Sequence, residues 1–171
     1  MTLHDPRRAG ADGETRVFGK HRGSVVNNFD LQGLGRVQVQ VPSVYGTETI
    51  NWAMPCVPYA GPGQGLFMIP PVGANVWVEF EGGDIDFPIW SGCFWGAGET
   101  PATEPTTKVL KTPAGTVTLN EIAPTPLVIE TPDGTRISIG PTGITLETAA
   151  GATVELAGPR VSVNGGALEV I

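Results

Sequence analysis

The sequence predicts an all-β protein, in which a small closed barrel precedes a short needle of paired strands. Three observations lead to this fold class. The chain of 171 residues contains 24 Gly and 16 Pro, nearly a quarter of its length, so turns must be frequent. Its apolar residues alternate with polar ones, as in half-buried strands. No window repeats apolar residues with a period of 3.6, so we expect little helix.

The barrel is predicted from residues 17–96. In residues 36–41 ("RVQVQV"), the three valines would face one side of a strand and the two glutamines the other. Five or six short strands within about 80 residues suit a small barrel, whose closure removes exposed sheet edges. The other strand-like segments are residues 21–29, 50–60, 65–71, 75–81 and 88–95.

Two segments outside the strands have other patterns. Residues 1–16 are polar and small, which predicts a flexible N-terminal arm. Residues 97–110 ("GAGETPATEPTTKV") are rich in Pro, Thr and Gly, which predicts a linker. Residues 111–171 follow this linker as a region of a different kind.

Residues 111–171 repeat with a period of 17. Gly134, Ile137, Ile139, Ile144 and Leu146 each have an equivalent residue 17 positions later, from Gly151 to Val163. A degenerate earlier copy begins at Gly115 and an incomplete one follows at Leu168. A fixed short period is typical of solenoids and fibres.

Each repeat strand offers only about two apolar residues to an interior, and an isolated strand or hairpin is marginal in water. A single chain could coil into a parallel β-helix, although such helices usually have longer turns. Alternatively, three chains could wind together and meet at a common axis. We favour an intertwined trimer of about seven short strands per chain. The predicted axis residues are Val117, Leu119, Leu127, Ile129, Ile137, Ile139, Ile144, Leu146, Val154, Leu156, Val161, Val163, Leu168 and Val170.

Charge and composition exclude several classes of function. A net charge of −7 opposes binding to nucleic-acid backbones, which needs clustered Lys and Arg. No apolar run reaches 18 residues and no export signal is recognised. Cys56 and Cys93 are expected to be buried free thiols, with pairing left open. No catalytic, cofactor or metal site is predicted, because neither Cys56 with His21 nor any serine lies in a nucleophile motif.

Three further features suggest binding sites, but each is better explained by structure. "GPGQG" at 61–65 precedes a strand pattern and not a helix, so a β-turn is expected in place of a phosphate loop. Glu79, Glu81, Asp84 and Asp86 match no calcium loop, which favours solvated residues. Four tryptophans could stack on sugars or bases, but packing or subunit contact is favoured; they are Trp52, Trp77, Trp90 and Trp95.

Residues 21–96 resemble the oligonucleotide/oligosaccharide-binding (OB) barrel of phage baseplate assembly protein V, which also occurs in contractile-tail central spikes and in the VgrG proteins of type VI secretion. The resemblance covers roughly 75 residues. It is carried by Gly-x-Val at 23–25, Leu-Gly-Arg-Val at 34–37, Trp52, Pro71 with Gly73, Val-x-Val-x-Phe at 76–80, Gly83-Asp84, and Pro88 leading to Gly92.

The resemblance implies an OB barrel beneath a separate tail hub protein, with a homotrimeric β-helical needle pointing to the target membrane. The expected function is mechanical: a central spike that helps to pierce the cell envelope. No lysozyme domain fits into the linker, and the His-x-His iron site of some spikes is absent, because the two histidines are His4 and His21. A PAAR-type cap is expected at the apolar end "NGGALEVI".

The carrier would be a phage tail, a tailocin or a related injection or secretion machine. Such a particle is assembled in the bacterial cytoplasm and becomes extracellular if released. The alternative function is a trimeric fibre or adhesin that binds carbohydrate through its barrel. A spike would lie on the tail axis, whereas an adhesin would lie at the periphery.

Overall fold

The computed structural model describes residues 7–9 and 15–170 and is almost entirely β-structure. The chain divides into two compact units, residues 1–98 and 99–171. Only short helical turns occur in the described residues, the one-turn helix α1 (Pro42–Tyr45) and the 3-10 turn η1 (Glu81–Gly83). None of the helices in these residues is long and apolar enough to span a membrane.

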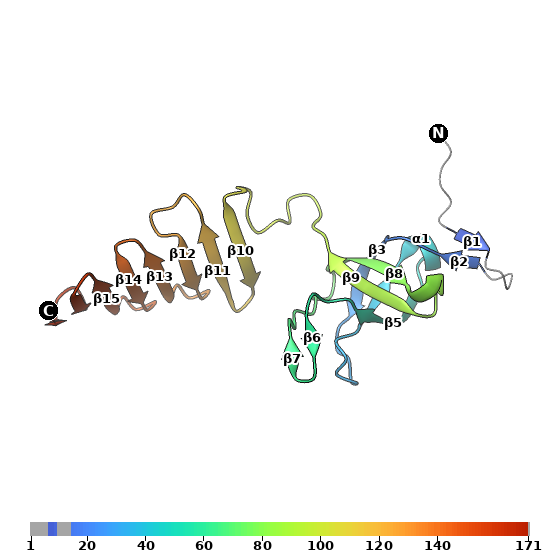
Figure 1. The fold of residues 1–171 in the computed structure, drawn as a ribbon, viewed down its shortest axis with the longest axis horizontal. Helices are drawn as coiled ribbons and strands as arrows, with labels where there is room; N and C mark the ends of the chain where they lie inside the picture. Colours follow the sequence, from blue (N-terminus) through green and yellow to red (C-terminus); the bar gives the residue numbers. More distant parts are fainter. Residues whose placement is uncertain (1–6, 10–14, 171) are drawn as a thin grey trace. The chain divides into compact units, whose positions relative to one another are not determined.

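The first unit contains a closed five-stranded barrel with the order β3-β4-β5-β9-β8 (Figure 1). Neighbouring strands are antiparallel except β5 and β9, which are parallel. The strands are β3 (His21–Asn27), β4 (Val37–Gln40), β5 (Thr49–Pro55), β8 (Asn75–Phe80) and β9 (Pro88–Cys93).

Two small hairpins accompany the barrel. β1 (Arg7–Ala9) pairs with β2 (Thr15–Val17), so part of the expected flexible arm is strand, whereas residues 1–6 and 10–14 lie outside the described residues. β6 (Ala60–Gly61) pairs with β7 (Gln64–Gly65), which places the expected turn of "GPGQG" at the tip of a hairpin.

The barrel interior is filled mainly by valine. Val37 and Val39 on β4 are completely buried, while Gln38 and Gln40 between them are only partly buried, as the alternation predicts. β-Branched side chains fit a pleated surface well, which explains their use in a small barrel. The buried apolar residues are Val17, Val25, Val37, Val39, Val41, Ala53, Val76, Val78, Phe80 and Trp90.

One expected barrel strand does not form. Residues 66–71 were expected to be a strand but have no strand pairing. Pro70 and Pro71 have no backbone N–H to donate to a sheet. Phe67 is 79% exposed, so this segment does not use its apolar residues to fill the barrel.

Strand directions bring three chain segments to the same end of the barrel. β3 ends where β4 begins, and β5 and β9, which are parallel, also end there. The loop of residues 28–36, the connection of residues 56–74 and the chain after Cys93 therefore leave the barrel at one end, which we call the exit end. Phe87, which precedes β9, lies at the opposite end.

The second unit is one eight-stranded antiparallel sheet in which each strand pairs with the next along the chain (Figure 1). Its strands are β10 (Thr107–Thr112), β11 (Gly115–Asn120), β12 (Leu127–Glu130), β13 (Arg136–Gly140), β14 (Gly143–Glu147), β15 (Thr153–Ala157), β16 (Arg160–Val163) and β17 (Leu168–Val170).

The 17-residue repeat corresponds to two strands and their two turns. In the turn of residues 131–135, the Thr131 N–H donates to the Thr135 carbonyl, at 2.9 Å between N and O. In the turn of residues 148–152, the N–H of Thr148 donates to the carbonyl of Ala152 at the same distance. The fourth residue of both turns is glycine with positive φ, 93° at Gly134 and 87° at Gly151. Successive repeats therefore share one turn geometry.

Two expectations for this region need correction. β10 begins at Thr107, inside the expected linker of residues 97–110, because residues 107–112 pair with β11. In the intertwined trimer that we favoured, strand edges would pair between chains, but strands β11 to β16 have neighbours of the same chain on both edges. Short turns favour pairing within a chain, because closing a short loop costs little conformational entropy.

Candidate assembly interface

The sheet of the second unit has one apolar face, formed by two ladders of residues that lie opposite one another on successive strands. Residues directly opposite in an antiparallel pair point to the same face. One ladder runs Leu110, Val117, Ile129, Ile137, Leu146, Val154, Val163, Leu168. The other runs Lys108, Leu119, Leu127, Ile139, Ile144, Leu156, Val161, Val170.

The register brings together all fourteen residues that the sequence assigned to the axis. Leu110 was missed because it lay in the expected linker. Lys108 begins the second ladder as its one charged member, and its ammonium group binds the Glu121 carboxylate and the Pro105 carbonyl. The apolar face therefore has a polar boundary at its first strand.

Within a single chain this face is not covered. Ile129 is 42% exposed and Leu156 is 40% exposed, whereas the valines of the barrel core are nearly inaccessible. None of the ladder residues whose side chains are described is buried. Removing apolar surface from water stabilises by about 25 cal/mol per Å². A row of half-exposed aliphatic residues along eight strands is therefore a strong driving force for association.

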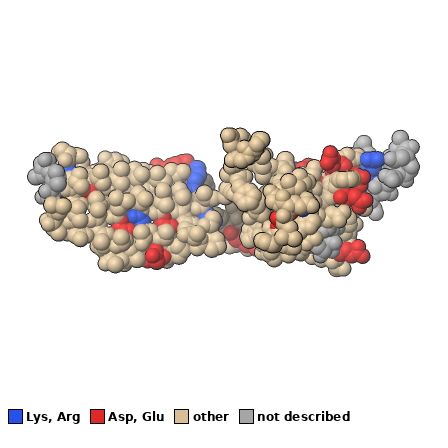
Figure 2. All heavy atoms as spheres, turned by 90° about the horizontal axis from the view of Figure 1, so that it is seen from below, with Lys and Arg blue, Asp and Glu red and all other residues tan. Residues whose placement is uncertain are grey.

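The opposite face of the same sheet is mostly polar. Ser138 lies opposite Thr145, and Thr145 lies opposite Glu155. Arg136 and Glu147 form an ion pair across β13 and β14, with 2.8 Å between Nη2 and Oε2. Charged side chains are scattered on the surface seen in Figure 2. The sheet thus has a solvent face and a face suited to burial.

The apolar face is hollowed. A cavity of about 380 Å³ lies over strands β13 to β16, where Ile137, Leu146, Val154 and Val163 follow one another along the first ladder. Side chains of another molecule would fill such a hollow, because protein interfaces pack as densely as interiors.

The four tryptophans of the barrel do not form one platform. Trp90 is buried, and its indole N–H donates to the Gly35 carbonyl at 3.2 Å. Trp52 and Trp77 each lie beneath an arginine, with 5.4 Å from the Arg36 guanidinium carbon to the Trp52 ring centroid and 5.1 Å from Arg22 to Trp77. These are intramolecular cation–π contacts. Trp95 is 65% exposed.

The acidic residues near η1 have local roles. The Glu79 carboxylate pairs with Lys20, at 3.0 Å between Oε2 and Nζ, and this bond lowers the pKa of Glu79. Asp84 accepts a hydrogen bond from the backbone N–H of Asp86 at 3.0 Å. In the part of the chain that the structure describes, no group of three His, Cys, Asp or Glu residues could hold a metal ion.

The cysteines are free, and the expectation that they are buried is wrong. Cys56 and Cys93 are both exposed; Cys56 directly follows β5, and Cys93 is the last residue of β9. Partial desolvation still raises the pKa of the Cys93 thiol. His21 is buried at the start of β3, where its Nδ1 lies 3.2 Å from the Ser43 hydroxyl. Cys56 follows the end of β5, at the opposite end of the barrel, so the two residues do not form a nucleophile–base pair.

Comparison with protein families matches two consecutive parts of the chain. Residues 21–95 match the type VI secretion system/phage-baseplate injector OB domain, which corresponds to the closed barrel. Residues 107–169 match the phage baseplate V C-terminal trimerisation domain, which corresponds to the sheet with the apolar face. No curated protein matches the chain. Because the two matches together span most of the chain, it belongs to the phage baseplate V family, as a structural baseplate component of a phage tail or tail-like particle.

Proposed function

We propose that this protein is the homotrimeric central spike of a contractile injection system. Three copies would place their apolar faces against one another, so that the fourteen predicted axis residues and Leu110 line the interior of a triangular prism. The observation that carries the proposal is the uncovered apolar face on a domain whose family is a trimerisation domain.

The interactions that hold this prism together would differ from those of the intertwined needle that the sequence suggested. Hydrogen bonds within each chain build its three walls, and apolar packing between chains joins the walls. Stiffness would come from both sources, since every strand from β11 to β16 is bonded on two sides and packed interiors resist compression.

The partners of the spike follow from the family's organisation. A separate tail hub protein would hold the barrel, and sheath contraction would drive the needle into the target membrane. A PAAR-type protein would cap β17, the last strand of the stack, because an open strand edge invites association. Assembly would take place in the bacterial cytoplasm, with release only as part of a whole particle.

The trimer is tested by light scattering on the purified full-length chain. We expect a mass close to three times the chain mass of 17.9 kDa. A folded monomer at micromolar concentration would disprove the proposal. The position of the protein within the particle is tested by electron microscopy of particles labelled with an antibody against this chain. Label on the tail axis below the tube supports a spike, whereas label at the periphery would favour an adhesin.

A further inference from the structure

The exit end of the barrel exposes large apolar side chains. Leu31 is 88% exposed, Phe67 is 79% exposed and Trp95 is 65% exposed. They lie on three different segments, the loop of residues 28–36, the connection of residues 56–74 and the chain after β9. Large exposed apolar residues that share one end of a domain favour an interaction site there.

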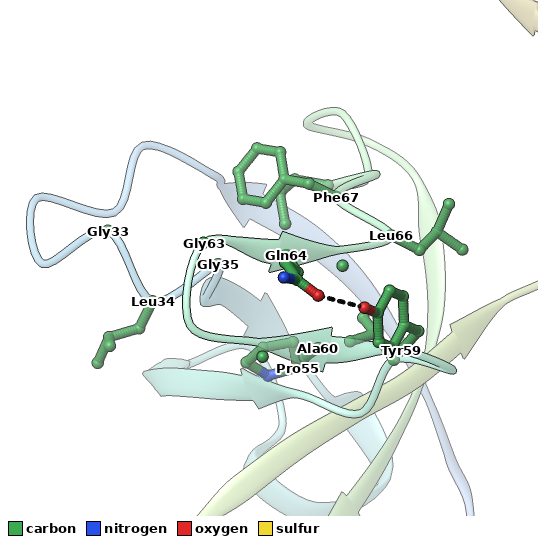
Figure 3. Close-up of a pocket in the computed structure, with 14 residues that line it drawn as sticks. Gly33, Leu34, Gly35, Pro55, Tyr59, Ala60, Gly63, Gln64, Leu66 and Phe67 are labelled. Carbon is green, nitrogen blue, oxygen red and sulfur yellow. Dashed lines mark hydrogen bonds between the residues drawn. The ribbon is translucent and has the colours of Figure 1, made fainter.

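A pocket lies between two of these segments (Figure 3). We call it the exit-end pocket. Its volume is about 400 Å³, near the lower end of the range of about 300–1,000 Å³ for binding sites, so it suits one aromatic side chain. The Tyr59 hydroxyl donates to Gln64 Oε1 at 2.7 Å at its rim. Its apolar lining includes Leu34, Pro55, Val57, Leu66, Phe67 and Ile69.

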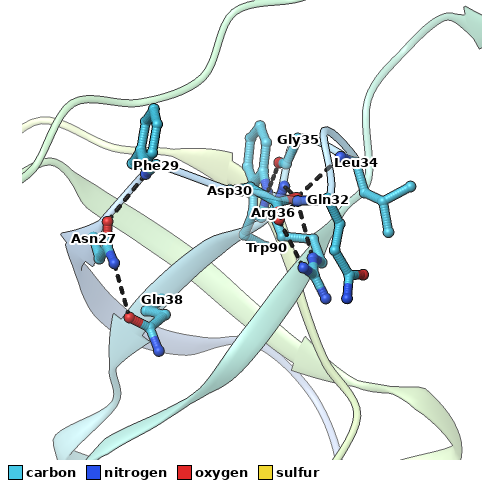
Figure 4. A network of polar contacts seen from close by, with 9 residues as sticks. All are labelled: Asn27, Phe29, Asp30, Gln32, Leu34, Gly35, Arg36, Gln38 and Trp90. Atoms are coloured by element: carbon cyan, nitrogen blue, oxygen red, sulfur yellow. Dashed lines mark hydrogen bonds and ion pairs between the residues drawn. The ribbon is translucent and has the colours of Figure 1, made fainter.

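One wall of the pocket is held rigidly by Asp30 (Figure 4). Its carboxylate accepts hydrogen bonds from the backbone N–H of Gln32 and of Leu34, both at 3.0 Å. It also pairs with the Arg36 guanidinium at 2.7 Å, which holds the pKa of Asp30 well below its usual range. Trp90 ties the same loop to the core through Gly35. A preformed wall lowers the entropy lost on binding.

Chain connectivity points to another copy of this protein as the occupant. The 13 residues 94–106 connect β9 to β10. When fully extended they span at most about 45 Å. Joining three copies through their C-terminal sheets would therefore tether the three barrels within one assembly, which raises the effective concentration of one exit end at another. This step rests on the trimer proposed above.

Trp95 is the aromatic residue that this arrangement offers. It lies two residues beyond β9, in the connecting segment, and is mostly exposed. A buried aromatic side chain contributes about 150–250 Å² of contact. Each copy carries both a pocket and a Trp95, so in a trimer with threefold symmetry a head-to-tail contact would close into a ring.

We propose that Trp95 of each copy inserts into the exit-end pocket of the neighbouring copy and so joins the three barrels of the trimer to one another. The three barrels would then form a ring.

Disulfide trapping tests the contact in the full-length protein. In a background of Cys56→Ser and Cys93→Ser, the pair Trp95→Cys and Leu34→Cys is oxidised and run on a non-reducing denaturing gel. We expect covalent dimers and trimers. The matched control combines Trp95→Cys with Phe87→Cys, which is 60% exposed at the opposite end of the barrel, and should stay monomeric.

The outcomes separate this inference from the proposed function. A trimer by light scattering that yields only monomer bands from the Leu34 pair would overturn the Trp95 contact and leave the spike intact. A monomer by light scattering would overturn both. As a second measurement, Trp95→Ala in the native sequence should keep the trimer mass but speed amide exchange in residues 57–69. Unchanged exchange there would assign the pocket to another partner and overturn the inference.

Discussion

Deletion of residues 131–147 should shorten the C-terminal stack by two strands without unfolding it. The deletion removes the turn of residues 131–135 together with β13 and β14. It joins Glu130 directly to the turn of residues 148–152, which has the same hydrogen bonds as the turn that it replaces. β12 would then pair with β15, with Ile129 opposite Val154.

The expected length of the stack, and the amount by which the deletion shortens it, follow from the spacing of the strands. Eight strands in one sheet give seven intervals, or about 34 Å at roughly 4.8 Å each. Removing two strands should shorten the stack by about 10 Å. The remainder should stay folded, because repeat arrays depend mainly on contacts between neighbours.

Deletion of residues 131–139 is the matched control. It removes nine residues, so the turn at Pro141 and Thr142 would place Ile144 opposite Glu130 and Ile129 opposite Thr145. A slip of one residue moves side chains to the wrong face. We expect this variant to lose its trimer and unfold at lower temperature.

Solution scattering and electron microscopy of the intact protein and the two deletions measure length, and light scattering measures mass. If the 17-residue deletion leaves the length unchanged, or is as damaging as the nine-residue deletion, the stacked-repeat reasoning is wrong.

Ile139→Asp would bury one carboxylate per chain at the predicted axis, at a cost of several kcal/mol each, so the trimer should dissociate. The control Ser138→Asp lies on the polar face and should leave the trimer mass and the melting temperature nearly unchanged. Equal effects of the two substitutions would contradict the assigned face. Gly143→Ala should destabilise the fold strongly, because the added Cβ would lie 1.9 Å from a backbone oxygen. The Cβ of Gly158→Ala meets no atom within 4 Å, so this control should cost only about 1–2 kcal/mol of stability. Similar melting temperatures for the two variants would argue against the close approach at Gly143. Because the pKa of Asp30 is lowered in the folded state, its stabilisation is present above the unfolded value of about 3.9 and is lost as pH falls towards the folded value. The stability difference between the native protein and Asp30→Asn should thus shrink in strong acid, and a constant difference between pH 2 and pH 7 in denaturant titrations would refute this assignment.

The ladder residues could be predicted because their spacing has a physical meaning. Alternation identifies the inward positions of each strand, and the 17-residue period aligns one strand pair with the next. Residues such as Ile137 and Val154 were therefore assigned to the same face without knowledge of the register. The pairing partner of each strand could not be read in this way, since pairing within a chain and pairing between chains use the same residue pattern.

Other features depend on tertiary contacts that a local pattern does not carry. Leu110 and Lys108 lay in a segment whose Pro and Thr content is typical of linkers, yet pairing with β11 makes it a strand. The exit-end pocket combines loops far apart in sequence. The network at Asp30 was also missed, because a carboxylate within a loop does not indicate that it binds three backbone amides and an arginine.

Lys108 makes the two edge strands of the C-terminal sheet chemically different. At the opposite end of its ladder stands Val170, whose register continues the aliphatic series. An additional strand before β10 would have to cover an ammonium group and its Glu121 partner, and burying an ion pair is rarely favourable. Lys108 thereby disfavours the addition of a further strand at the β10 edge of the sheet, whereas the β17 edge has no such charged residue in this ladder.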